Sequence, residues 1–291
     1  MLTGQLDTLS SDELSDLCTP LADCISVKPG IPDQEIVSLL EDHGYDQAPV
    51  CDREQQVVYG LVNTSTLRDL MQAGKTLERN KIGAQAEQLF FHIGAFTKIE
   101  QLFSKLAQKQ AVLVIRESDA TEYGLWQSCL GLLTISDLNR HQLRASLYLI
   151  LSTLESALAR LVERSFSDPW EWVKTLNKTH QVGVLGYWEL SKRRGVDIGP
   201  IAATTLAQLI QVVSRSKELL HNIGFSSRSQ FEEQTGQVPE LRNSVMHPVR
   251  PLILDQSDVQ RVNQTMLCAL ELIRKIETVV PHHKPQHGQT G

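Results

Sequence analysis

The N-terminal half of the chain carries the stretch GLLTISDL at residues 131–138, which decides its fold. The apolar run from Cys129 to Leu133 predicts a short strand. A helix is predicted to begin again at Ser136-Asp137, because Ser and Asp cap helices well. A carboxylate also accepts two hydroxyls well, and a Thr hydroxyl at a helix N-terminus, such as that of Thr134, donates to an anion. The stretch therefore predicts a strand and a helix joined by a turn that either caps the helix or binds a ligand.

Around this stretch, the same order of elements is predicted twice. The first copy is predicted as an extended piece, a helix, two strands and a helix, at residues 25–27, 32–40, 48–51, 57–62 and 64–71. The second copy repeats this series at residues 89–93, 96–109, 111–115, 129–133 and from 136 onward. The N-terminal half therefore contains an internal repeat of βαββα type.

The repeat and the GLLTISDL stretch resemble a tandem pair of CBS domains, the ligand-sensing Bateman module. The resemblance covers residues 18–141, with a first copy at 18–74 and a second at 85–141. The first copy departs from the family pattern, because Asn63 replaces the Thr and Thr66 replaces the Asp. The resemblance therefore implies at most one competent nucleotide site, in the second copy.

In the CBS family, the Asp of this stretch usually takes the ribose hydroxyls and the Thr lies near the phosphate. Carried over to this chain, the resemblance implies a nucleotide site formed by Thr134, Ser136 and Asp137. Its ligand would be a regulatory adenine nucleotide such as AMP, ADP, ATP or a related compound. The alternative is that these three residues only cap the following helix.

Composition is typical of a soluble globular protein, with 291 residues, 41% of them hydrophobic. No run approaches the ~18 apolar residues of a membrane span, and the polar, acidic start argues against an ordinary signal peptide. The five Cys are scattered without a Cys-x-x-Cys pair, which favours reduced thiols. We therefore expect a cytoplasmic protein that does not contact a membrane. The sequence also lacks a Gly-x-x-x-x-Gly-Lys phosphate loop and a clustered Cys/His zinc set, so no metal site is predicted.

Charge is divided unevenly along the chain. Residues 1–141 hold 11 Lys and Arg against 20 Asp and Glu, a net charge of −9. Residues 142–291 hold 17 against 14, a net charge of +3. This asymmetry indicates two parts with separate roles, and the mildly basic half permits RNA binding without being diagnostic of it.

The C-terminal half, residues 142–280, has a helical pattern throughout. A helix is predicted to run without a break from Ser136 to about Arg164, so that the last helix of the first part continues into the second. Residues 1–17 are predicted to be a polar lead-in with a short helix at 11–17, and residues 281–291 a disordered tail. The fold class is therefore α+β and multidomain, with βαββα repeats followed by an all-α bundle.

One polar motif stands between two apolar helical segments of this half. It is ELRNSVMHP, residues 240–248, in which Arg242 and Asn243 precede His247. Pro248 biases His247 away from helical angles, so this His is predicted at or just past a helix end. Arg offers a fixed fork of donors to phosphate oxygens, and His moves a proton near neutral pH. The alternative is a surface Arg, a capping Asn and a helix-end His without catalytic role.

This half resembles the HEPN superfamily of helical bundles over about residues 142–280, with an Arg-x4-His motif. The resemblance implies a metal-independent endoribonuclease in which two protomers pair and Arg242, Asn243 and His247 are catalytic. The RNA product would carry a 2′,3′-cyclic phosphate, and the homodimer would form through both parts. Some subgroups carry a Tyr two residues after the His, where this chain has Val249, which argues against a nucleotide-transfer target there. Inactive HEPN bundles also exist, so the alternative is a non-catalytic, nucleotide-binding dimeric regulatory protein. A cellular role such as toxin or defence does not follow from the sequence.

Overall fold

The computed structural model describes residues 8–52, 54, 57–76, 90–93, 96–116, 129–168 and 170–280. The chain divides into two compact units, which we call the N-terminal and the C-terminal unit. The N-terminal unit is formed by Leu2–Arg144 together with Pro251–Asn263, and the C-terminal unit by Ala145–Arg250 with Gln264–Gly291. The segment Pro251–Asn263, which the sequence pattern assigned to the helical half, thus belongs to the N-terminal unit. The predicted tail, residues 281–291, lies outside the described residues.

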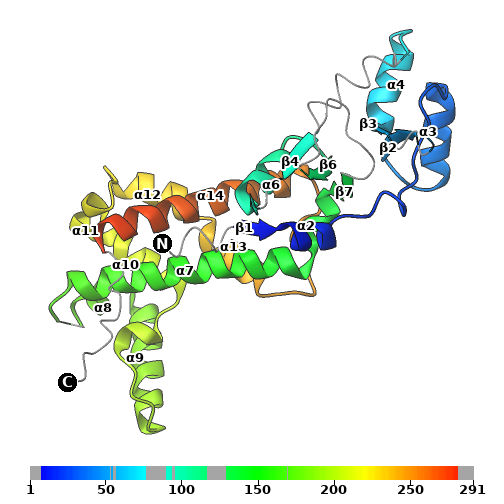
Figure 1. Cartoon of the computed structure of the whole chain (residues 1–291). Helices are drawn as coiled ribbons and strands as arrows, with labels where there is room; N and C mark the ends of the chain where they lie inside the picture. The colour runs from blue at the N-terminus through cyan, green and yellow to red at the C-terminus, as the bar shows by residue number, and fades with distance from the viewer. Residues whose placement is uncertain are drawn as a thin grey trace, which may run out of the picture. The chain divides into compact units, whose positions relative to one another are not determined.

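The first predicted copy is present in the N-terminal unit (Figure 1). Val27 forms a parallel bridge with Val50, and the further elements are α3 (Asp33–Asp42), antiparallel strands β2 (Gln47–Asp52) and β3 (Val57–Asn63), and α4 (Thr64–Gln72). The two helices and the hairpin share one apolar core, which consists of Val27, Ile36, Val37, Leu40, Ala48, Val50, Val62 and Leu67. Asn63 caps helix α4, since its Oδ1 accepts the Thr66 N–H at 2.7 Å.

The same order of elements follows in the second copy. It consists of β4 (Phe90–Ile93), α6 (Ile99–Leu106), β6 (Ala111–Arg116), β7 (Cys129–Thr134) and a 3-10 helix, η3 (Ile135–Asn139). Strand β6 lies between β4, which is parallel to it, and β7, which is antiparallel. Helix α6 begins three residues later than predicted, because β5 (Phe96–Lys98) pairs instead with β1 (Thr8–Ser10).

The two hairpins share an irregularity at the same place. In β2–β3, Val50 pairs with Gly60 and the register shifts directly after Val50. In β6–β7, Val114 pairs with Gly131 and the register shifts directly after Val114. A side chain at Gly131 would place its Cβ 2.3 Å from the Thr19 carbonyl oxygen, because Thr19 bridges the neighbouring Leu132. The glycine of the GLLTISDL stretch therefore permits the close approach of Thr19, at the start of the first copy.

The chain before the first copy forms α2 (Ser11–Leu17), as predicted, and the buried Leu14 and Leu17 make it part of the core. The prediction of one unbroken helix from Ser136 is wrong. Arg140 has an extended backbone with ψ 149°, which ends η3, and α7 (His141–Ser165) begins only after it. Apolar periodicity continues through both elements and therefore does not reveal this break.

Helix α7 is long and apolar enough to span a membrane by length and composition alone, contrary to the expectation from the sequence. Core helices of globular proteins meet the same criterion. In the C-terminal unit, α7 is part of the core through its buried residues: Leu147, Ile150, Leu151, Leu154, Ala157, Leu158, Leu161 and Val162.

The C-terminal unit is helical in its described residues. After α7 it contains α8 (Glu171–Thr175), α9 (Lys178–Arg193), the 3-10 helix η4 (Pro200–Ala203), α10 (Leu206–Arg215), α11 (Lys217–Asn222), α12 (Arg228–Thr235), α13 (Val238–Val245) and the C-terminal part of α14 (Gln256–Val279). Residues 200–222 form three separate helices, η4, α10 and α11, and not one long helix. Thr205 caps α10 and Ser216 caps α11, so local side-chain hydrogen bonds end each helix where apolar periodicity alone predicts continuation.

Candidate functional site

The N-terminal unit contains a cavity of about 560 Å³. Its lining comes from five stretches of chain, all within this unit: residues between Thr19 and Ile25, Tyr45 to Gln47, Gln110, residues between Leu132 and Asp137, and Leu254 to Gln256. The three predicted nucleotide-binding residues, Thr134, Ser136 and Asp137, all line it. A volume of this size is within the range of small-molecule sites in proteins.

Asp137 is buried at the edge of this cavity and uses both carboxylate oxygens. Oδ2 accepts the N–H and the hydroxyl of Thr134, at 2.8 and 2.9 Å. Oδ1 accepts Nε and Nη2 of Arg140, at 3.0 and 2.8 Å, and Arg140 Nη1 donates to the Asp16 carbonyl at 2.8 Å. A carboxylate has about four lone-pair positions, so Asp137 already holds the turn together. The two alternatives for this stretch, a turn that caps the helix and a turn that could bind a ligand, thus involve the same residues, which close the turn and line a cavity.

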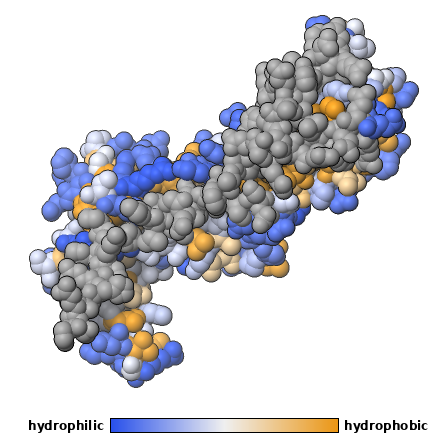
Figure 2. Space-filling model, viewed as in Figure 1, coloured by the Kyte–Doolittle hydropathy of each residue, from blue (hydrophilic) through white to orange (hydrophobic). Residues whose placement is uncertain are grey.

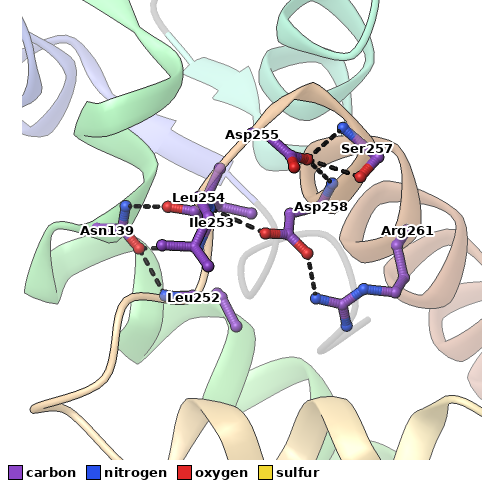
Figure 3. A network of polar contacts seen from close by, with 8 residues as sticks. All are labelled: Asn139, Leu252, Ile253, Leu254, Asp255, Ser257, Asp258 and Arg261. Carbon is purple, nitrogen blue, oxygen red and sulfur yellow. Dashed lines mark hydrogen bonds and ion pairs between the residues drawn. The ribbon is translucent and has the colours of Figure 1, made fainter.

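The segment Pro251–Asn263 reaches the cavity from a distant part of the sequence, and Asn139 holds it there (Figure 3). Asn139 Oδ1 accepts the N–H groups of Leu252 and Ile253, at 2.6 and 2.9 Å. Asn139 Nδ2 donates to the Ile253 carbonyl at 2.8 Å. These three bonds join backbone at residues 252–253 to η3, and we call them the Asn139 clamp. Sequence reasoning missed this contact, because no local pattern connects residues more than a hundred positions apart.

The start of α14 is capped by carboxylates beside the same cavity (Figure 3). Asp255 Oδ1 accepts the N–H of Ser257 at 2.8 Å and that of Asp258 at 3.1 Å. Asp258 Oδ2 in turn accepts the Leu254 N–H at 2.9 Å. The Ser257 hydroxyl also donates to Asp255 Oδ1 at 2.6 Å, and this bond lowers the pKa of Asp255 below its ordinary value, so the carboxylate is anionic at neutral pH.

The Arg–His motif lies at the end of α13 in the C-terminal unit. Its apolar side is anchored by the buried Leu241 and Val245, while Arg242 is half-buried and Asn243 is exposed. The helix ends at Val245, and the N–H of His247 donates to the Ser244 carbonyl at 3.2 Å in the turn that follows. The prediction that His247 lies just past a helix end is confirmed, and its side chain is exposed.

No group of three or more His, Cys, Asp or Glu in the described part of the chain is placed to hold a metal ion. The five cysteines, which all lie in the described part of the chain, form no disulfide: Cys18, Cys24, Cys51, Cys129 and Cys268. Cys24 lines the cavity and donates to the Thr19 carbonyl at a distance of 3.6 Å.

A comparison with protein-family models matches residues 14–73 to the CBS domain. The N-terminal part of the chain therefore contains a CBS domain, which begins within α2 and includes the first predicted copy. The matched residues contribute Thr19 to Ile25 and Tyr45 to Gln47 to the cavity, whereas Thr134, Ser136 and Asp137 lie beyond the match.

Among solved structures, the chain is similar to "the CBS domain of the bacterial CNNM/CorC family Mg2+ transporter in complex with ATP". The two share 15% sequence identity with a TM-score of 0.30, over 43% of this chain and 82% of that one. A comparison with curated proteins gave no match.

Proposed function

We propose that this chain is a nucleotide-responsive ribonuclease. Its N-terminal unit would be a tandem CBS pair, with copies at 18–74 and 85–141, that binds an adenine nucleotide. Its helical part, residues 142–280, would be a HEPN-like domain that cleaves RNA without a metal ion.

The observation that carries the sensing function is the cavity beside the GLLTISDL turn. It is about 560 Å³ in volume and is lined jointly by residues of the matched CBS domain and by Thr134, Ser136 and Asp137. The shared hairpin irregularity at Gly60 and Gly131 supports a second CBS copy, because both copies use the same pairing. In this proposal the ligand's ribose hydroxyls approach Asp137 and exchange with one of its present donors.

The observation that supports a nuclease is that the motif is reachable by a large substrate. Arg242 is half-buried, and Asn243 and His247 are exposed at a helix end. Arg242 would stabilise the charge on the phosphorane, for which one donor contributes roughly 3–4 kcal/mol. His247 would move the proton as general acid or base, with a rate effect of ~10²–10⁴. Asn243 would position one of these groups, and attack by the 2′-hydroxyl would leave a 2′,3′-cyclic phosphate.

A homodimer is part of this proposal, since HEPN-like sites form from two protomers. Helix α9 supports it, because this helix exposes an unusual number of large apolar side chains (Figure 2, lower end). They are Val182, Leu185, Tyr187 and Leu190, exposed by 70%, 40%, 58% and 45%. Sedimentation equilibrium on the full chain would measure the dimer directly.

The experiment that tests the proposal is RNA cleavage in the presence of EDTA, with and without AMP, ADP and ATP. We expect His247→Ala to slow cleavage by about 100-fold or more, and one nucleotide to change the rate of the parent protein. His221→Ala, which removes another exposed histidine of the same unit, is the matched control and should cleave like the parent. A His247→Ala protein that cleaves as fast as the parent would exclude this mechanism.

The second candidate is a non-catalytic, nucleotide-binding regulatory dimer, favoured by the weak charge of +3 in residues 142–291. It predicts nucleotide binding and dimerisation without RNA cleavage under any condition. If RNA is cleaved but the rate does not respond to nucleotide, the nuclease proposal stands, the sensing proposal fails, and the N-terminal unit is a scaffold.

A further inference from the structure

The cavity beside the GLLTISDL turn has an acidic lining. Its charged side chains are carboxylates: Asp23, Asp46, Asp137 and Asp255. Among the described residues that line it there is no Lys or Arg. Arg140 compensates only Asp137, with which it forms an ion pair at 2.8 Å. For the other three carboxylates, the described lining residues supply no Lys or Arg, so a chain of phosphates would be repelled there.

Four backbone donors at the two helix starts beside the cavity are already used by the protein. At the turn, the Thr134 N–H donates to Asp137 and the Ile135 N–H donates to the Gln110 carbonyl at 3.1 Å. At the start of α14, the N–H groups of Ser257 and Asp258 donate to Asp255. An incoming phosphate would have to displace a carboxylate that belongs to the fold, whereas helix N-termini bind phosphate through N–H groups that are available.

The cavity instead offers hydrogen-bond acceptors. They are the carboxylate oxygens of Asp23, Asp46 and Asp255, which line it. Ribose hydroxyls and the amino group of adenine are donors to such oxygens.

We infer that this site takes a nucleoside, or a nucleoside with a neutral or cationic 5′ substituent, in preference to a nucleoside di- or triphosphate. The inference rests on the proposed nucleotide site and narrows its ligand. Asp255 acts as a specificity-determining residue, and it is supplied by the segment Pro251–Asn263, beyond the matched CBS domain. Its pKa is lowered by the Ser257 hydrogen bond, which keeps the charge in place at neutral pH.

The test is calorimetric titration of the full chain, without magnesium, with adenosine, 5′-amino-5′-deoxyadenosine, AMP, ADP and ATP. We expect adenosine and the 5′-amino compound to bind most tightly and the affinity to fall by roughly tenfold from AMP to ATP, because charge repulsion grows with each phosphate. Higher salt should narrow this difference, since it screens exposed charges.

Three single substitutions test which carboxylates cause the preference for adenosine over ATP: Asp23→Asn, Asp46→Asn and Asp255→Asn. Asn caps helices as well as Asp, so the Asp255→Asn protein keeps the start of α14. Each is expected to raise the ratio of ATP to adenosine affinity by about threefold to tenfold. Asp69→Asn, on the exposed face of α4 and outside the cavity, is the matched control and should leave the ratio unchanged.

The outcomes separate this inference from the proposed function. If ATP binds the parent most tightly, or if the three substitutions leave the ratio unaltered, the inference is wrong while the nucleotide sensor stands. If none of the five compounds binds, the proposed sensing function fails and the inference fails with it.

Discussion

The reactivity of the Cys24 thiol can be used to measure whether the cavity of the N-terminal unit is occupied. Burial raises the pKa of Cys24, and the neighbouring Asp23 raises it further. Burial also raises the pKa of Cys18 and Cys129 to about 12. All three are therefore protonated at neutral pH, and the reactive thiolate forms only in alkaline solution. Of the three, Cys24 lines the cavity, so its reaction should depend on ligand occupancy.

Alkylation of Cys24 by iodoacetamide should be slow at pH 7 and should accelerate as the pH rises above 9, because a raised pKa moves thiolate formation upward. Adenosine at saturating concentration should slow this reaction about tenfold or more by occlusion. Cys268, whose pKa burial raises to about 11 in the C-terminal unit, is the internal control and should be unaffected by the ligand. Mass spectrometry of peptides resolves the two sites, and equal protection of both would count against ligand binding beside Cys24.

Sequence reasoning identified Thr134, Ser136 and Asp137, and the structure brings all three to one cavity. Local chemistry suffices there, since Gly, Thr and Asp at those spacings define a turn. It did not identify Asp46 or Asp255, because these residues approach only through tertiary pairing. Nor did it find the ion pair of Arg140 with Asp137, three positions away, because many Arg residues stand at such spacings without pairing.

The Asn139 clamp is the element-scale feature that joins η3 to the segment before α14. The Asn139 side chain alone accepts the N–H groups of Leu252 and Ile253 and donates to the Ile253 carbonyl. It thus forms the backbone hydrogen bonds that a neighbouring strand would otherwise form. Further contacts fix the same segment, including the bond from Ser104 Oγ to Asn263 at 3.4 Å. The segment is thereby held at the cavity by side chains of the second copy.

Asn139→Ala should destabilise this docking by about 2–3 kcal/mol, because three bonds of roughly 0.5–1.5 kcal/mol each are lost. Hydrogen exchange of the Leu252 and Ile253 amides should accelerate accordingly, since both lose their acceptor. Asn139→Asp should have a smaller effect, because it retains the acceptor and loses only the donor to Ile253. Asn222→Ala, at an exposed position of α11, serves as control. Unchanged exchange at residues 252 and 253 would show that other contacts hold the segment.

At the element scale, strands were easier to predict than helix ends. Both hairpins, including the second strand pair at 111–115 and 129–133, follow from short apolar runs. The breaks at Arg140, Thr205 and Ser216 did not follow, because apolar spacing continues through each of them. Backbone angles at one residue and capping by a side chain decide those ends, and neither alters the hydrophobic pattern.

The whole molecule depends on α14, which contributes to both units. Its first residues belong to the N-terminal unit, where Val259 and Val262 are buried, and the remainder belongs to the C-terminal unit. The buried residues there are Met266, Ala269, Leu270, Leu272, Ile273 and Ile276. Burial of a large aliphatic side chain contributes roughly 1.5–3 kcal/mol. The summed contribution of the buried α14 side chains is therefore comparable to the whole net free energy of unfolding of a domain, ~5–15 kcal/mol.

A chain that stops after Arg250 should therefore lose both units, although it retains the matched CBS domain and the Arg–His motif. We expect no cooperative thermal transition and no adenosine binding. A chain that stops after Val280 is the matched control and should melt within about 2 °C of the parent, since it retains all of α14 and the buried Val280. Circular dichroism and calorimetry measure both, and a cooperative transition in the shorter chain would show that the units do not need α14.

The discontinuity of the N-terminal unit also has a consequence for biosynthesis. A ribosome finishes residue 144 long before it reaches residues 251–263, which complete that unit. At ~5–20 residues per second, the 119 residues from 145 through 263 take roughly 6–24 s to translate. During this interval the nascent chain holds an unfinished pocket, and the Arg–His motif emerges before the wall that carries Asp255. The cavity is thus completed late in synthesis, and silent codon changes that slow translation after His247 would lengthen the period in which it is incomplete.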